Sequence, residues 1–114
     1  MAKFMVIGMG PGSKDEMESG MGVWDDTFKE FPDINMLDIF GNFAEHRLIC
    51  TMEAPSINRI SEMFLKFAEN WKKAGMPTGE MEAEPQMEIL PIDYFAEHDK
   101  LIYTEDLEKV KAGA

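Results

Sequence analysis

His46 and Asp38 are the residues of this chain whose types and positions best suit chemistry. Histidine is the side chain best suited to proton transfer near neutral pH, and a carboxylate beside it can help it act as a general base on a weakly acidic C–H or O–H group. Asp38 interrupts one apolar segment, and His46 stands just before the next one. We therefore take His46 and Asp38 as candidate catalytic residues, provided that both face one cavity. The alternative is that Glu45 and His46 are solvent-exposed hairpin residues, with the imidazole hydrogen-bonded to the turn.

Cys50 and His98 are the other residues with nucleophilic or metal-binding chemistry. A metal site needs three or four N, O or S ligands, which these two residues and the catalytic candidates could supply if His98 came from a partner chain. The chain has no H-x-H, H-x-x-x-H or C-x-x-C spacing, so we expect neither a metal nor another cofactor. Cys50 lies among apolar residues, so we expect an inert core thiol. It is the one cysteine of the chain and cannot form an intramolecular disulfide, which fits a reducing, cytoplasmic location.

A glycine-rich stretch, Gly8-Met9-Gly10-Pro11-Gly12, follows the first apolar run as a nucleotide-binding loop would. The dinucleotide pattern G-x-G-x-x-G fails because its third position is Ser13, and Pro11 lacks the backbone N–H that a phosphate would use. The P-loop pattern fails as well, because no Gly-Lys-Ser/Thr follows. We interpret the stretch as a turn that lines one mouth of the dimeric barrel predicted below, and Ser13 with Glu16 as a capping box that begins a helix.

The elements that position these residues follow the order strand, helix, strand, strand, helix, strand. Apolar runs predict strands at residues 4–7, 34–40, 47–52 and 86–92. Apolar residues at steps of three and four predict a helix before Pro32 and a second one between Ser56 and Gly75. The stripes are Met17, Met21, Trp24, Phe28 and Phe31, then Ile57, Ile60, Phe64, Phe67 and Trp71. This order predicts an α+β fold of the ferredoxin-like βαββαβ type, a four-stranded antiparallel sheet with both helices on one face.

The predicted strands are apolar on both sides, although two helices can cover only one side of a sheet. We therefore expect a second copy of the chain on the open side, which gives a sheet-to-sheet dimeric α/β barrel with a central cavity. The residues expected to line the ligand cavity are Phe4, Val6, Met36, Phe40 and Cys50. We place the protomer at residues 1–93, and we expect the extension 94–114, with a short helix from Thr104 to Lys111, to pack on the partner subunit.

Three short motifs resemble those of small, uncharacterised members of the dimeric α/β-barrel superfamily. They are the first strand KFMVIG at residues 3–8, the pair Glu45-His46 before the third strand, and the turn EAPS at residues 53–56. The resemblance covers about Lys3 to Pro91 and implies the fold above. The superfamily includes cofactor-free monooxygenases of aromatic substrates, lactone isomerases, polyketide cyclases and haem-degrading enzymes.

The phrase FAEH occurs twice, at residues 43–46 and 95–98. We interpret this as a coincidence and not a repeat, because the first copy is predicted in a hairpin connection and the second in the tail.

The charge balance argues against two classes of partner. The formal net charge is −11, from 22 acidic and 11 basic residues, which argues against nucleic acid and anionic membranes as partners. We predict a cytoplasmic homodimer that binds an apolar or aromatic small molecule in its barrel, with isomerase, cyclase or cofactor-free monooxygenase chemistry at His46. The alternatives are a non-catalytic binding or accessory protein, and a metal-binding protein.

Overall fold

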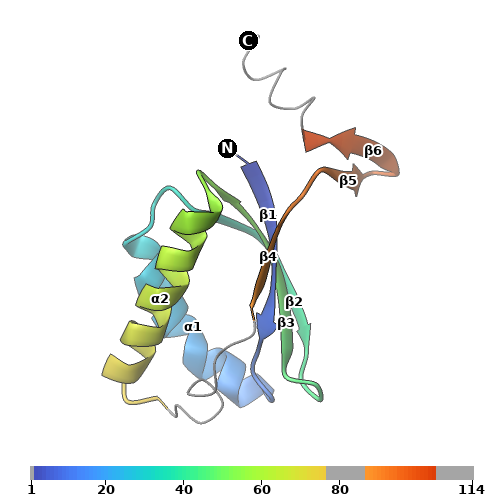
Figure 1. Cartoon of the computed structure of the whole chain (residues 1–114). Helices are drawn as coiled ribbons and strands as arrows, with labels where there is room; N and C mark the ends of the chain where they lie inside the picture. The colour runs from blue at the N-terminus through green and yellow to red at the C-terminus, as the bar shows by residue number, and fades with distance from the viewer. Residues whose placement is uncertain (1, 77–86, 105–114) are drawn as a thin grey trace.

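The computed structural model describes residues 2–76 and 87–104, and its elements follow the predicted order (Figure 1). They are β1 (Ala2–Met9), α1 (Lys14–Lys29), β2 (Asn35–Asn42), β3 (Arg47–Ala54), α2 (Ile57–Lys73) and β4 (Glu88–Pro91), followed by β5 (Tyr94–Glu97) and β6 (Lys100–Tyr103). The βαββαβ order is confirmed. The last two strands were not predicted, and the helix expected from Thr104 to Lys111 lies outside the described residues beyond its first position.

The sheet has the strand order β2-β3-β1-β4, with every neighbouring pair antiparallel. Both helices lie on the same side of it, as Figure 1 shows. The other side carries no helix among the described residues. The α+β fold with a four-stranded antiparallel sheet and two helices is therefore confirmed. β5 and β6 form a separate two-stranded hairpin.

The helix ends are fixed by the local chemistry that the sequence indicates. The Ser13 side chain accepts a hydrogen bond from the Glu16 N–H (3.2 Å), and the Glu16 carboxylate accepts one from the Gly12 N–H (2.6 Å). Ser56 caps α2 in the same way by accepting from the Arg59 N–H (3.1 Å). Gly75, at φ 73°, ends α2, because its left-handed conformation brings two N–H groups back to the last turn: those of Gly75 and Met76 bond to the carbonyls of Lys72 and Trp71.

The core lies between the sheet and the two helices. Its largest fully buried side chains include Met52, Ile60 and Met63. The predicted helix stripes are only partly right, because Met21 and Ile57 are each 42% exposed. The buried residues of α1 are Gly20, Val23 and Thr27. The buried face of α1 is rotated from the predicted stripe because α1 packs on α2 as well as on the sheet. Thr27 Oγ1 accepts a hydrogen bond from Asn70 of α2 (3.1 Å), and Trp24 stacks on Phe67 of α2 with ring centroids 3.9 Å apart.

A bulge in β2 changes which residues share a face. Met36 pairs with Met52 on the helix side, but the register then shifts, and Asp38 pairs with Thr51 on the open side. We expected Met36 and Asp38 on one face, and the structure separates them. Asp38, Phe40 and Asn42 do share a face.

Candidate functional site

Four of the five predicted cavity residues lie on the helix side of the sheet. Phe4, Val6 and Cys50 are buried in the core at 5%, 1% and 0% exposure, and Met36 is partly buried against it. Burial raises the pKa of the Cys50 thiol to about 12, so the group stays protonated at neutral pH. These four side chains fill the space beneath the helices, so a molecule on the other side of the sheet would contact their neighbours instead.

The opposite side of the sheet carries a second apolar surface, which we call the open sheet face. It is formed by Met5, Ile7, Phe40, Ile49 and Leu90, which the strand register places on the side away from the helices. Phe40 lies opposite Ile49, and Met5 opposite Leu90. Phe40 is 56% exposed and Leu90 40%, while the other three are half-buried. Phe40 is the predicted cavity residue that belongs to this face.

A polar pair, Asp38 and Thr51, lies beside the open sheet face, and Glu88 opposite Ile7 adds a charged side chain on the same side of the sheet. Thr51 Oγ1 donates a hydrogen bond to Asp38 Oδ2 at 3.0 Å, and the two residues are opposite one another in the register. The carboxylate has a further oxygen and remaining lone pairs, so it can accept a hydrogen bond from a hydroxyl or N–H group of a bound molecule. An apolar surface with one such acceptor can both hold and orient a small ligand.

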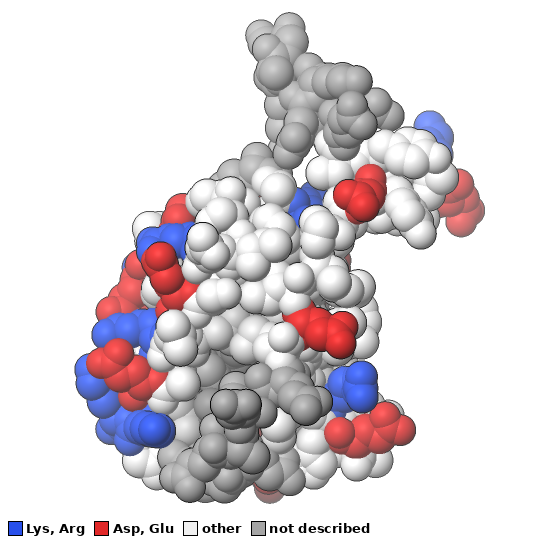
Figure 2. All heavy atoms as spheres, in the orientation of Figure 1, with Lys and Arg blue, Asp and Glu red and all other residues white. Residues whose placement is uncertain are grey.

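The helix side of the molecule has a different character. Figure 2 shows acidic and basic side chains gathered over it. Several form ion pairs: Lys66 with Glu30 and Glu69 at 3.7 Å each, and Lys73 with Glu69 at 3.0 Å. Hydrogen bonding to Lys73 and the charge of Lys66 lower the pKa of Glu69. The helix side is therefore a solvated, charged surface, whereas the open side of the sheet is apolar in its middle and charged near the strand ends.

His46 lies in the turn between β2 and β3, where it holds two chain segments together. Its φ is 51°, its carbonyl accepts a hydrogen bond from the Gly10 N–H (2.7 Å), and its N–H donates to the Phe43 carbonyl (3.2 Å). Its ring lies so close to Gly12 that a Cβ at residue 12 would overlap it. A Cβ at Gly10 would approach the Leu48 Cβ to 2.8 Å. The glycine-rich stretch is therefore a turn, as predicted, whose glycines allow close approach to the hairpin.

The structure does not bring His46 and Asp38 together. Asp38 pairs with Thr51, five residues beyond His46 in β3, and at about 3.3 Å per residue the strand spans roughly 16 Å between them. His46 lies past the final register pair at the hairpin end, whereas Asp38 lies within the sheet. The condition of one shared cavity is thus not met within a single chain.

A small apolar hollow of about 160 Å³ opens beside the His46 turn. It lies between the start of α1 and the end of the β2–β3 hairpin, and its walls include Pro11, Met17, Ile39, Phe43 and Leu48. Phe43 and Arg47, which also lines the hollow, flank His46 in the sequence. The glycine-rich stretch contributes Pro11 to this hollow, which is distinct from the barrel cavity whose mouth the stretch was expected to line.

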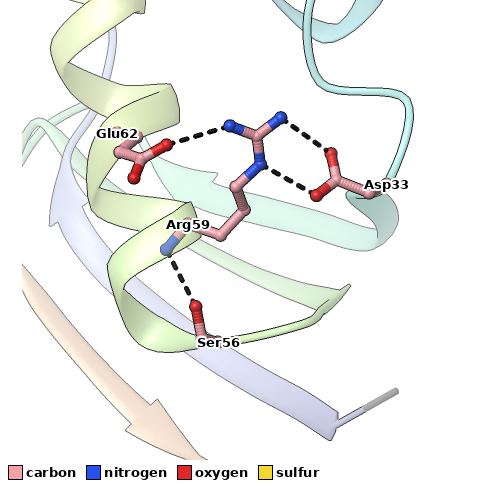
Figure 3. A network of polar contacts seen from close by, with 4 residues as sticks. All are labelled: Asp33, Ser56, Arg59 and Glu62. Carbon is pink, nitrogen blue, oxygen red and sulfur yellow. Dashed lines mark hydrogen bonds and ion pairs between the residues drawn. The ribbon is translucent and has the colours of Figure 1, made fainter.

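The polar network around Arg59 has a structural role. Arg59 of α2 donates two hydrogen bonds to the Asp33 carboxylate (2.8 and 3.2 Å) and one to Glu62 (2.9 Å), as Figure 3 shows. Its guanidinium lies 4.4 Å from the centroid of the Phe31 ring. The hydrogen bond from Arg59 lowers the pKa of Asp33. Because these groups engage one another, the network ties the loop before β2 to α2.

Within residues 2–76 and 87–104, no group of three or more His, Cys, Asp and Glu side chains could hold a metal ion. No helix in that part of the chain is long and apolar enough to cross a membrane.

Comparison with known proteins gives one structural likeness. No protein-family model matches the chain, and no curated protein matches it. Among solved structures, it is similar to SCO4226 from Streptomyces coelicolor A3(2), with a TM-score of 0.48 and 18% identity. The match covers 58% of this chain and 83% of that one.

Proposed function

We propose that this chain forms a homodimer by packing two open sheet faces together, and that the resulting barrel binds an apolar or aromatic small molecule. The observation that carries the proposal is the apolar middle of that side of the sheet, where Met5, Ile7, Phe40, Ile49 and Leu90 lie side by side. Apart from Asp38, the charged residues of the same side lie at or next to the strand ends: Lys3, Arg47, Glu53 and Glu88. An antiparallel sheet whose outer side meets water ordinarily alternates apolar and polar residues. A two-fold dimer covers the face with an identical one and leaves no copy of it exposed.

Asp38 and Thr51 define what such a cavity would select. A ligand with an aromatic or aliphatic body and one hydroxyl or N–H group would place that group against the Asp38 carboxylate. Proton transfer in the cavity, as an isomerase, cyclase or cofactor-free oxygenase requires, would also fall to Asp38. His46 of the same chain lies outside the apolar face. A non-catalytic binding protein would use the same surface without a reaction.

The oligomeric state tests the first half of the proposal. We expect light scattering after size-exclusion chromatography to give the dimer mass for the wild-type chain. Phe40→Lys places a charge in the proposed interface and should give a monomer of unchanged circular dichroism. The matched control is Leu65→Lys on α2, because Leu65 is 74% exposed and lies on the helix side. A monomeric wild-type chain, or a Phe40→Lys variant that dimerises as well as the control, would contradict the proposal.

Ligand selection tests the second half. Phenol carries a hydroxyl group where toluene carries a methyl group. We therefore expect both to shift amide resonances of β1 and β3 in a ¹H–¹⁵N NMR titration, phenol at lower concentration. Asp38→Asn should reduce the preference for phenol, because the carboxylate is the stronger acceptor. The absence of shifts in the sheet with either probe would refute ligand binding at this face.

The hollow beside His46 favours a second candidate site for the same class of ligand. Its volume of about 160 Å³ is close to the roughly 150 Å³ of an engineered apolar cavity that takes up benzene. The same titration separates the two sites, because binding in the hollow would shift the amides of Met17 and Phe43 and leave those of Met5 and Thr51 in place.

A further inference from the structure

The hairpin of β5 and β6, residues 94–103, forms an arm beside the sheet. Figure 1 shows it leaving the end of β4 and turning to the side opposite the helices. The base of the arm is closed by Thr104, whose Oγ1 donates to the Ile92 carbonyl (2.6 Å) and whose N–H donates to the Asp93 carbonyl (3.0 Å). The arm therefore lies on the side of the open sheet face.

The arm has two different faces. Tyr94 pairs with Tyr103 and Ala96 with Leu101 on one face; Phe95 pairs with Ile102 on the other. The Phe95 face is held by the chain's own sheet, since the Lys3 ammonium lies 3.9 Å from the centroid of its ring. The first face is uncovered, with Tyr94 65%, Leu101 57% and Tyr103 50% exposed.

An uncovered hairpin of this kind needs a partner surface. A two-stranded hairpin alone is at best marginally stable in water. Its turn also uses two non-glycine residues at positive φ, His98 at 49° and Asp99 at 64°, a conformation that side chains other than glycine adopt at a cost. Packing the tyrosine face on another surface would offset that cost.

We propose that the face formed by Tyr94, Leu101 and Tyr103 packs on a second copy of this chain and clamps the two subunits together. The inference rests on the proposed homodimer, because the arm extends to the side on which the partner would sit. The exposed areas of the arm and of the open sheet face support a second copy of the chain as the partner. The three side chains expose about 300 Å² together, and the open sheet face a similar area, whereas a standard interface buries about 800 Å² per partner. Either surface alone is too small for a stable dimer, and the two together approach the required area.

The first test measures the dimer dissociation constant of the full chain by sedimentation equilibrium. We expect Leu101→Ser and the double variant Tyr94→Ser/Tyr103→Ser to weaken dimerisation about tenfold or more, because aromatic anchors dominate interface energies. Glu97→Gln is the matched control, since Glu97 is exposed on the opposite face of the arm and should leave the constant unchanged. Unchanged dimerisation in all three variants would overturn the inference and leave the proposed homodimer intact.

A second test does not depend on the arm surviving substitution. A photoreactive residue in the full chain, Leu101→p-benzoylphenylalanine, is irradiated in a mixture of ¹⁴N- and ¹⁵N-labelled protein. Crosslinked peptides that combine both isotopes show that position 101 touches the other subunit, as we expect. Crosslinks confined to one isotope, including any to residues 105–114 of the same chain, would overturn the inference. A wild-type chain that sediments as a monomer would overturn the proposed homodimer as well.

Discussion

Alanine substitution at two glycines inside α1 should have different effects on stability, because only one of the two has a neighbouring side chain in the space that the new Cβ would take. A Cβ at Gly22 meets no atom within 4 Å, and the residue is exposed. Alanine is favoured over glycine in a helix interior by roughly 0.5–1 kcal/mol. A Cβ at Gly20 would lie 3.1 Å from Cζ3 of the Trp71 ring, which is tighter than ordinary contact. The same gain at Gly20 is therefore opposed by displacement of Trp71.

We expect Gly22→Ala to raise the free energy of unfolding by roughly 0.5–1 kcal/mol, or the melting temperature by about 2–5 °C. Gly20→Ala should be neutral or destabilising. It should also change tryptophan fluorescence, because Trp71, which packs at a tilt against Phe67 (ring centroids 5.6 Å apart), must move. Urea denaturation followed by circular dichroism gives both values. A Gly22→Ala variant that is no more stable than wild type, or a Gly20→Ala variant stabilised to the same degree as Gly22→Ala, would refute the argument from helix propensity and space.

Two further predictions follow from the pKa shifts. Cys50, fully buried and with its pKa raised to about 12, should resist a thiol reagent at mildly alkaline pH in the folded protein and react once urea unfolds it; rapid modification of the folded chain would show that β3 opens readily. The pKa of Asp33 is lowered by the Arg59 hydrogen bond, so its contribution to stability is complete above the ordinary aspartate value of about 3.9 and is lost as the pH falls through the lower folded value. Asp33→Asn should therefore be less stable than wild type at neutral pH, and the difference should shrink in acid; a pH-independent difference measured by urea denaturation would contradict this.

The helix boundaries could be predicted from the sequence because local chemistry alone sets them. Ser13 and Ser56 each accept a hydrogen bond from an N–H in the first turn that follows, and Gly75 supplies the left-handed residue after α2. Such signals act within a few residues, so they do not depend on the rest of the fold. The order of strands and helices along the chain could also be predicted, because these helices alternate with apolar runs.

The arm was not predicted because its turn lacks the usual residues. Tight hairpin turns with two residues at positive φ normally have Asn-Gly or Asp-Gly at those two positions. Here the two positions are occupied by His98 and Asp99. The two FAEH phrases both end at hairpin turns, and we expected the second in the tail. They differ in register: residues 43–46 form a turn, whereas in the second phrase only His98 leaves the strand.

The sequence could not show which side of the sheet each residue of the candidate site faces. In β1 both Phe4 and Met5 are apolar, so alternation does not tell which of them faces the helices. The bulge beyond Met36 then moves Asp38 out of step with its own strand, and no residue type there signals the shift. Asp38 lies on the open side of the sheet, whereas four of the residues predicted to line a cavity with it lie on the helix side.

The β2 bulge also bears on how copies of this chain avoid polymerising. β2 is a long strand at the border of the sheet, and an unpaired border of that kind can recruit further strands into fibres. The irregular backbone between Met36 and Asp38 breaks the regular spacing of donors and acceptors that an incoming strand would need. A charged side chain at the same point adds repulsion between identical borders. Growth by strand addition is thereby disfavoured, whereas the proposed pairing of two open sheet faces would end at two copies.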